Sequence, residues 1–347
     1  MSPIRLFIIG SLLLTACTST AAPAPPFGLP PLNLPADEAP HDAQTEWWYF
    51  NMHLLSDSGQ SYALHDVLFQ VQELDSDRTI YVRQIGMSDV NANRQHASER
   101  VRLQPSPITT DPNSFRFDIG PSLMEGVNGE YYRLTASVGP YEYDLSLRST
   151  TPPLAHGGIG LLEMGEAGVT YYYSRPRLAI SGHIFAKGSL IPVSGLGWFD
   201  KQWGDFQPVT VTWDWASVQL VDGTDLMVSR LYDRSNLLVN SYATIRRNEE
   251  SPVHLDADAF ELRPAHSKTW TSDRTGTRYV TDWVLSIPEF DINVVMVPKG
   301  ASSEFVSPAL GVNYWESPVT ILGADSRQEL GQGFIELNWQ PDSAASR

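Results

Sequence analysis

Hydrophobic and polar residues alternate in short runs along most of the chain from His41 onward. These runs are rich in Tyr, Trp, Val, Leu and Thr, and clusters of Gly, Pro, Asn and Asp separate them. This is the pattern of β-strands joined by turns. In residues 61–71 both alternating faces are largely apolar, so this strand is expected to be buried on both sides. No convincing long amphipathic helix is present in the pattern, which therefore predicts an all-β protein.

The clearest predicted hairpin joins residues 209–221 to residues 224–232. Asp222-Gly223 lies between them and suits a two-residue type I′ turn. That turn pairs Val221 with Thr224, and the register places two further pairs on one face of the ribbon: Trp215 with Arg230, and Trp213 with Tyr232.

Asp214 is expected on the opposite face of this hairpin, among mostly apolar neighbours. A carboxylic acid in such surroundings can keep its proton near neutral pH. The hairpin therefore makes Asp214 a candidate acid.

The N-terminus has the layout of a bacterial export signal. Arg5 precedes an apolar run at residues 6–14, and small residues follow; the run is too short to span a bilayer. Leu14-Thr15-Ala16-Cys17 resembles a lipobox, and Cys17 is the only cysteine of the chain, so it has no disulfide partner. Lipidation of Cys17 is expected, although a chance cysteine beside an ordinary signal stays open.

Residues 1–16 are thus interpreted as a lipoprotein signal peptide, and residues 17–40, which are rich in Pro, as a semi-rigid tether. Thr18 directly follows Cys17. An Asp in place of Thr18 would favour retention in the inner membrane. The expected location is the cell envelope, with a lipid anchor in the outer membrane and the protein facing the periplasm.

The formal net charge of -16 restricts the class of ligand. It argues against nucleic acid and against anionic lipid head groups, so a neutral, cationic or apolar ligand is expected. The histidines lack the His-x-His and His-Glu-x-x-His spacings of zinc sites, and Gly195 and Gly197 are not followed by a nucleotide-binding fingerprint. We expect no metal and no cofactor. A Gly-x-Ser-x-Gly motif of serine hydrolases is also missing from the sequence.

Three separated motifs are rich in aromatic and acidic residues: Glu46-Trp47-Trp48-Tyr49-Phe50, Gly197-Trp198-Phe199-Asp200-Lys201-Gln202-Trp203-Gly204 and Trp213-Asp214-Trp215. Together they resemble the AttH/CrtC-like family, the predicted secreted hydrolases related to carotenoid 1,2-hydratase. The resemblance spans residues 41–337 and includes Tyr171-Tyr172-Tyr173-Ser174 and Tyr314-Trp315-Glu316.

The resemblance implies an all-β fold of two tandem lipocalin-like domains, each an antiparallel β-barrel or sandwich. The first is expected at residues 41–205 and the second at residues 206–347, with the boundary near residues 204–209. A ligand is expected in a cavity or between the domains.

One motif departs from the family pattern. Members usually have Asp-His-x-Trp, with the His among the residues implicated in the carotenoid hydratases, and Lys201 takes its place here. A lysine cannot shuttle protons near neutral pH unless burial lowers its pKa. The carotenoid reaction itself, in which an acid protonates an alkene and water captures the cation, is therefore in doubt for this chain.

The leading hypothesis is an envelope enzyme that hydrates or hydrolyses a hydrophobic, isoprenoid- or lipid-like substrate with acid assistance. Each acid could instead be the partner of a buried Arg, and Arg230 could be a structural strut. The candidate catalytic residues are Asp200, Asp214 and Glu46. The candidate substrate-binding residues are Trp48, Lys201, Trp203, Trp213, Trp215, Arg230 and Tyr232.

Two other classes of function remain open. The chain could be a non-catalytic lipocalin-type carrier of a hydrophobic ligand, or a structural envelope protein. A carboxyl group that faces a cavity without a cationic partner would favour the enzyme, because a carrier gains nothing from a buried charge. The sequence leaves the substrate and the oligomeric state undetermined.

Overall fold

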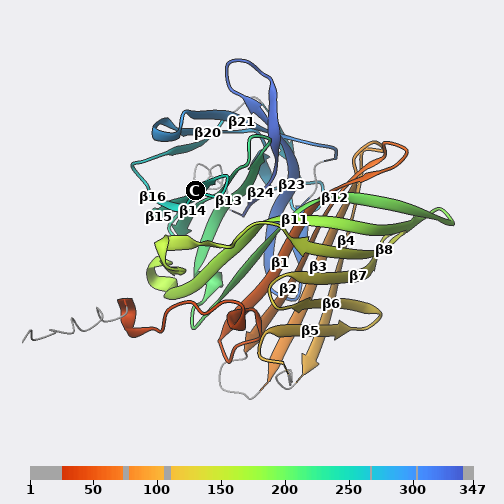
Figure 1. Ribbon diagram of the computed structural model, residues 1–347, viewed down its shortest axis with the longest axis horizontal. Helices are drawn as coiled ribbons and strands as arrows, with labels where there is room; N and C mark the ends of the chain where they lie inside the picture. Colours follow the sequence, from red (N-terminus) through yellow and green to blue (C-terminus); the bar gives the residue numbers. More distant parts are fainter. Residues whose placement is uncertain (1–25, 73–77, 105–110, 266–267, 302–303, 339–347) are drawn as a thin grey trace, which may run out of the picture. The chain divides into compact units, whose positions relative to one another are not determined.

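A computed structural model describes residues 26–72, 78–104, 111–265, 268–301 and 304–338 (Figure 1). The predicted signal peptide, Cys17 and residues 18–25 of the predicted tether lie outside these ranges. The chain divides into two compact units, residues 1–31 and 32–347, and the first contributes the 3₁₀ helix η1 (Pro26–Gly28). Within the described ranges no helix has the length and apolar character needed to cross a membrane. All further features belong to the second unit.

The prediction of an all-β fold is confirmed: strands dominate, and they form two large curled antiparallel sheets. The first has the order β4-β3-β2-β1-β12-β11-β8-β7-β6-β5, with β9 and β10 paired to β11. Its strands are β1 (Thr45–Ser56), β2 (Ser61–Gln72), β3 (Thr79–Asp89), β4 (Arg94–Gln104), β5 (Ser114–Ile119), β6 (Ser122–Val127), β7 (Tyr131–Val138), β8 (Tyr141–Ser149), β9 (Leu154–Ala155), β10 (Leu161–Glu163), β11 (Val169–Ala186) and β12 (Ser189–Gly204).

The second sheet has the order β16-β15-β14-β13-β24-β23-β21-β20-β17, with β22 paired to β23. Its strands are β13 (Val211–Leu220), β14 (Thr224–Asp233), β15 (Leu238–Arg247), β16 (Val253–Asp256), β17 (Glu261–Pro264), β20 (Trp283–Ile287), β21 (Ile292–Pro298), β22 (Glu304–Ser307), β23 (Val312–Gly323) and β24 (Glu329–Leu337). A separate ribbon pairs β18 (Thr269–Thr271) with β19 (Arg278–Val280). The short 3₁₀ helix η2 (Ala36–Glu38) precedes β1, and four more lie between strands: η3 (His156–Gly158), η4 (Gly165–Ala167), η5 (Pro208–Thr210) and η6 (Pro288–Phe290).

The chain passes from the first sheet to the second between Gly204 and Val211. Both sheets belong to the compact unit of residues 32–347. The division into two domains at residue 205 stays a prediction.

Strand alternation gives the central strands two buried faces. On β1, Trp48 and Phe50 point into a core enclosed by the first sheet, while Tyr49 points the other way and packs with residues of the second sheet, among them Trp215. The second sheet encloses a core of its own. The prediction for residues 61–71 is confirmed, because β2 is buried on both faces along most of its length.

The predicted register of the β13–β14 hairpin is wrong by one residue. Asp214 lies opposite Arg230, and Trp215 lies opposite Ser229. A slip of one residue exchanges the two faces of a strand. Asp214 therefore shares its face with Arg230, and both tryptophans lie on the other face.

The error has a local cause in the turn. A type I′ turn needs positive φ at both central residues, but only Gly223 has it (φ 91°) and Asp222 does not. The carboxylate of Asp222 instead accepts a hydrogen bond from the backbone N–H of Thr224 (2.9 Å), and the N–H of Gly223 donates to the carbonyl of Leu220 (3.2 Å). The loop thus contains Val221 as a third residue.

Candidate functional site

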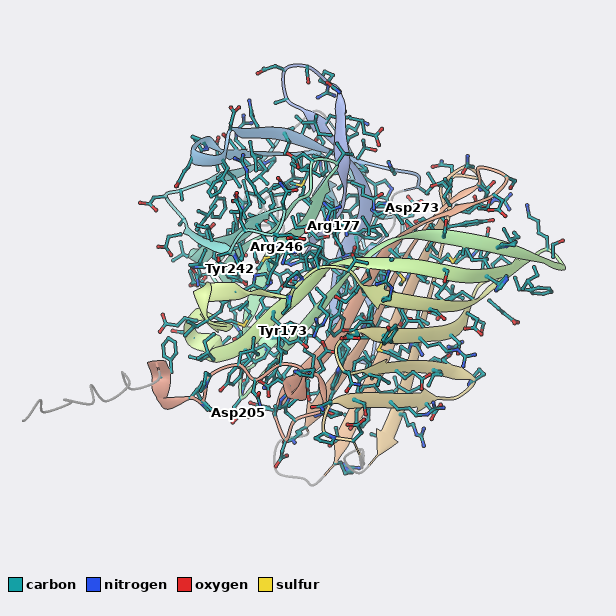
Figure 2. All side chains as sticks on the ribbon, in the orientation of Figure 1. Tyr173, Arg177, Asp205, Tyr242, Arg246 and Asp273 are labelled. Atoms are coloured by element: carbon teal, nitrogen blue, oxygen red, sulfur yellow. The ribbon has the colours of Figure 1, made fainter. Side chains whose placement is uncertain are left out.

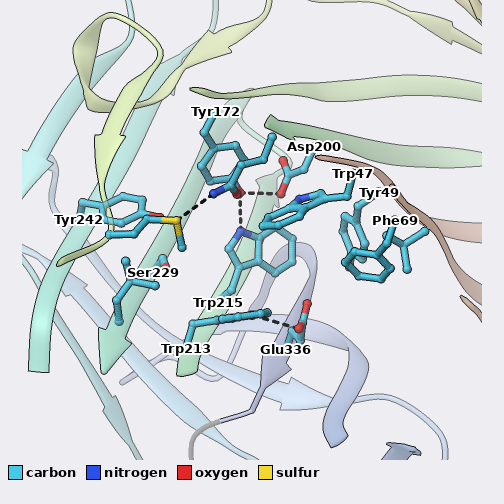
Figure 3. Close-up of a pocket in the computed structure, with 14 residues that line it drawn as sticks. Trp47, Tyr49, Phe69, Tyr172, Asp200, Trp213, Trp215, Ser229, Tyr242 and Glu336 are labelled. Atoms are coloured by element: carbon cyan, nitrogen blue, oxygen red, sulfur yellow. Dashed lines mark hydrogen bonds between the residues drawn. The ribbon is translucent and has the colours of Figure 1, made fainter. Parts of the chain in front are cut away.

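A pocket lies between the two sheets (Figure 3). The cavity has a volume of about 70 Å³. This is smaller than the roughly 300–1,000 Å³ of small-molecule sites, so a larger ligand requires its walls to move apart. Aromatic and aliphatic side chains make up most of the lining: Trp47, Tyr49, Val67, Phe69, Met164, Tyr172, Asp200, Gln202, Trp213, Trp215, Ser229, Leu231, Tyr242 and Glu336.

Alternate side chains along each strand point into the pocket, because neighbouring residues of a strand face opposite sides of the sheet. Asp200 and Gln202 lie on the pocket face of β12, and Lys201 between them points the opposite way. Trp213 and Trp215 reach the pocket from β13 because the hairpin register turns them away from Arg230. The two sheets thus each contribute one wall with an acid, Asp200 from the first sheet and Glu336 from the second.

Asp200 is buried and accepts three hydrogen bonds. Tyr172 Oη donates to Oδ2 (2.6 Å), while Trp198 Nε1 (2.6 Å) and the hydroxyl of Ser174 donate to Oδ1. Trp215 Nε1 donates to Tyr172 Oη (2.8 Å), so Tyr172 links the two walls (Figure 3). Burial raises the pKa of Asp200 to about 6, although its three donors favour the ionised form.

Glu336 is the second acid of the pocket. Its Oε1 accepts a hydrogen bond from Trp213 Nε1 (3.0 Å). Burial and the charge of Asp200 raise the pKa of Glu336 to about 7, against the hydrogen bond from Trp213, which lowers it. Both acids therefore titrate near neutral pH, where each can donate or accept a proton.

A third acid, Glu316, lies directly opposite Glu336 on β23. Tyr49 Oη donates to Glu316 Oε1 (2.5 Å), and His65 Nδ1 is 3.3 Å from Oε2. Burial and the neighbouring Glu336 raise the pKa of Glu316 well above its ordinary value, while burial lowers the pKa of His65 to about 4. Neutral His65 does not compensate a charge on Glu316, so Glu316 is held protonated.

In the part of the chain that the structure describes, neither Asp200 nor Glu336 forms an ion pair with Lys, Arg or His. A buried carboxyl group, Asp200, and a partly buried one, Glu336, thus face one aromatic pocket without a cationic partner. This is the arrangement that the sequence set as the criterion for an enzyme.

Four of the predicted site residues do not line the pocket: Glu46, Trp48, Lys201 and Trp203. They lie on the opposite face of β1 and β12, where the ammonium of Lys201 pairs with Glu46 and is 3.8 Å from the centre of the Trp48 ring. Glu46 also accepts hydrogen bonds from the backbone N–H of His41 (2.8 Å). Because strand neighbours point in opposite directions, the motif that contains Asp200 also supplies this ion pair.

Asp214, Arg230 and Tyr232 do not line the pocket either, contrary to expectation. Arg230 Nη2 donates to Asp214 Oδ2 (2.7 Å), and its guanidinium lies 5.0 Å from the ring centre of Trp283, inside the second sheet. Burial raises the pKa of Asp214 to about 6, and Arg230 opposes the increase. Asp214 and Asp200 therefore do not share a cavity.

The structure brings Asp200, Trp213 and Trp215 together as expected, and it adds residues that the sequence reasoning missed. Tyr172 and Ser174 lie in a segment that the family resemblance includes, but no role was assigned to them. Glu336 had only a weak signal, since it follows buried Phe334 on a face of β24 that also carries Gln332.

Ser174 and a buried histidine, His156, lie close to Asp200, but they do not form a nucleophilic triad. His156 Nε2 is 2.7 Å from Ser174 Oγ, as a base would be. In a triad the acid orients the other nitrogen of the histidine, whereas Asp200 contacts Ser174 itself and His156 Nδ1 has no hydrogen-bond partner in the described residues. The geometry does not fit a serine hydrolase.

Comparisons with known proteins agree with this fold. A family model described as AttH-like matches residues 26–339. The dehydratase asqC of Emericella nidulans is 24% identical over 184 residues, which are 48% of this chain and 50% of that protein, so the match spans half of its length. No metal-holding group of three or more His, Cys, Asp or Glu occurs among the described residues.

Two solved structures share the fold. A crystal structure described as AttH from Nitrosomonas europaea has a TM-score of 0.79 and 23% identity, and covers 92% of this chain and 99% of its own. Kievitone hydratase from Nectria haematococca has a TM-score of 0.71 and 19% identity, and covers 89% and 93%.

Proposed function

The chain belongs to the AttH-like family, and from this membership we propose that it is a hydro-lyase. It adds water to, or removes water from, an apolar substrate held between the two sheets. One observation carries the proposal: Asp200, which is buried, and Glu336, which is partly buried, face the same aromatic pocket and have no cationic partner in the described residues. Burial of such groups destabilises a fold, so a binding protein alone would gain nothing from them.

One acid donates a proton and the other accepts one in each direction of the reaction. In the direction of hydration, Glu336 gives its proton to an alkene carbon, water attacks the electron-deficient carbon, and Asp200 removes a proton from the attacking water. In the direction of elimination, Asp200 returns its proton to the departing hydroxyl, and Glu336 takes the proton from carbon. General acid and base catalysis of this kind contributes roughly 10²–10⁴-fold each.

The aromatic walls suit an apolar substrate and a reaction with cationic character. Trp213 and Trp215 from one sheet and Trp47 and Tyr49 from the other surround the pocket. The faces of aromatic rings attract positive charge, by about 0.5–2 kcal/mol for each ring. An isoprenoid- or lipid-like alkene, or a flat apolar ring, fits this chemistry. The names of two similar proteins, dehydratase and kievitone hydratase, also denote reactions of water.

Lys201 has a limited effect on this proposal. Its ammonium pairs with Glu46 on the face of β12 that points away from the pocket. A substrate between the sheets therefore does not meet the position at which this chain departs from the carotenoid hydratases.

The test is a search for water exchange in a natural mixture of apolar compounds. The purified protein is incubated with an apolar extract of its own cells in water labelled with oxygen-18, and mass spectrometry follows compounds that gain or lose one water. We expect such a compound with the wild type and none with the variant Asp200→Asn/Glu336→Gln. A compound that co-purifies with both proteins and is changed by neither would contradict the enzyme and favour the carrier.

The proposed mechanism predicts a bell-shaped dependence of kcat/KM on pH. The active form has Asp200 ionised and Glu336 protonated. Below about pH 6 Asp200 gains a proton, and above about pH 7 Glu336 loses one, so the maximum is expected between these values. Initial rates measured from roughly pH 5 to pH 8 check this. A flat profile over that range would contradict the assignment of the two acids.

We also propose that Cys17 anchors the protein by lipid to the outer membrane, where it faces the periplasm. The lipobox-like tetrapeptide before it supports this proposal. Replacing Cys17 by Ala is expected to stop cleavage by lipoprotein signal peptidase and incorporation of labelled palmitate, measured by gel shift and radiolabel. Continued cleavage and labelling of the variant would show that another residue is modified.

A further inference from the structure

A chain of buried polar groups leads from Asp200 away from the pocket. Ser174 lies directly opposite Asp200 on β11 and donates its hydroxyl to Oδ1. His156, in η3, contacts Ser174 through Nε2 (2.7 Å), and its ring centre is 4.2 Å from that of Tyr172. Ser174 and His156 are both fully buried. Neither Ser174 nor His156 has a role in the mechanism proposed above.

At the far end of this chain, three polar atoms are buried without a hydrogen-bond partner in the described residues: His156 Nδ1, Thr244 Oγ1 and His254 Nδ1. Thr244 on β15 lies directly opposite His254 on β16, and both strands contact η3. Arg246, which is labelled in Figure 2, lies on the same face of β15 as Thr244 and donates to the carbonyl of Pro152 (2.6 Å). This face therefore contacts the segment that leads into η3.

A water molecule suits these three atoms, because buried polar groups are normally satisfied and a buried water makes about three hydrogen bonds. The side chain of His254 is 24% exposed, and its Nε2 is 3.5 Å from Asp256 Oδ1. His254 therefore joins the buried end of the chain to solvent.

We propose that Ser174, His156 and a buried water form a proton relay between Asp200 and His254 at the surface. The proposal rests on the hydro-lyase function, because each hydration leaves Asp200 with an extra proton and Glu336 without one. In the relay, Asp200 gives its proton to Ser174 Oγ while Ser174 gives its own to His156 Nε2. His156 then releases the proton on Nδ1 to the water, which passes one to His254. The reverse sequence delivers a proton to Asp200.

The relay requires His156 to change tautomer with the charge of Asp200. When Asp200 is ionised, Ser174 donates to it and accepts from His156, whose proton is on Nε2. When Asp200 carries a proton, it donates to Ser174, which donates to His156, whose proton is then on Nδ1. His156 stays neutral in both states, because burial and the nearby His254 hold its pKa well below its ordinary value.

Few other titratable groups influence the charge of Asp200 or the tautomer of His156. Tyr172, Tyr242 and Glu336 act on Asp200, and Tyr172 and His254 act on His156. The pKa values of both tyrosines are raised above 10, so these groups stay neutral. Asp256, beside His254, and Arg246, on the same face of β15 as Thr244, are further charged groups along the path.

The test uses the full chain labelled with nitrogen-15 in histidine and needs no substrate. Between roughly pH 5 and pH 8, the two ring nitrogens of His156 are expected to exchange their chemical shifts in a tautomer change with a midpoint near 6, where Asp200 titrates. Ser174→Ala and Asp200→Asn should abolish the change, and Ser174→Thr, which keeps the hydroxyl, should retain it.

Two results would overturn the relay: a His156 tautomer that stays constant in the wild type, or a change that survives in Ser174→Ala. If Ser174→Ala does not fold, the wild-type titration alone decides. In turnover, His156→Gln is expected to lower kcat at least tenfold with KM unchanged, and an unchanged kcat would also contradict the relay. Failure of the hydro-lyase proposal is separate, since it would appear as a wild-type protein that changes no compound by one water, whatever the tautomer of His156.

Discussion

Replacing Glu336 by Gln is expected to lower kcat by roughly two to four orders of magnitude. The amide keeps the shape of the side chain and can still accept the hydrogen bond from Trp213 Nε1, but it cannot donate a proton to an alkene. The rate of water addition to the compound found with labelled water measures the loss. Binding of that compound is expected to persist, because the aromatic walls are unchanged.

The same substitution is expected to stabilise the protein at neutral and higher pH. Burial raises the pKa of Glu336 from 4.5 to about 7 in the folded chain. The folded form therefore holds the proton more tightly than the unfolded form, and the free energy of unfolding falls as pH rises between these values. Gln removes this loss, so a gain of about 3 kcal/mol is expected above pH 7 and none below about pH 4.

Urea unfolding at two pH values measures this gain, and Glu329→Gln is the matched control. Glu329 lies on the same strand, but its side chain is 64% exposed, so neither activity nor stability should change by a comparable amount. Full activity of Glu336→Gln would refute the role of this acid. A variant that is less stable than the wild type at pH 8 would show that the carboxyl group serves packing.

Replacing Lys201 by Met is expected to destabilise the fold by about 3–5 kcal/mol. The ammonium of Lys201 is the cationic partner of Glu46, and both side chains are fully buried. Without it, the Glu46 carboxylate is left in the protein interior unless it takes up a proton. Burial lowers the pKa of Lys201 to about 8, so the wild type itself loses the ammonium above that pH. The loss is therefore expected to be largest near neutral pH and to diminish both in acid and above about pH 8.

The double variant Lys201→Met/Glu46→Gln provides the control, because it removes both charges and should recover most of the stability. Denaturant unfolding of the two single variants and the double variant measures the coupling between the residues. Activity of the folded fraction should persist, since neither side chain lines the pocket. A single variant within about 1 kcal/mol of the wild type would contradict a buried ion pair, because exposed pairs contribute no more than this.

The sequence showed which types of residue form the site, but it showed only in part which of them lie together. The aromatic and acidic motifs identified Asp200, Trp213 and Trp215 correctly as neighbours. Glu46 and Lys201 are neighbours as well, yet they point to the other side of the same strands. An acid beside a tryptophan has the same local pattern whether it faces a pocket or a buried arginine, which is why Asp214 could not be separated from Asp200.

The sequence by itself determined the class of fold and the faces of each strand, because strand alternation is a local property with a period of two. The same alternation makes Asp200 and Lys201 point apart, although both were expected in one site. The tertiary structure decided which face meets the other sheet, and so brought Glu336 on β24 to the same pocket as Asp200 on β12. It also decided the hairpin register, since loops of two and three residues differ little in free energy while the packing of whole strand faces differs greatly.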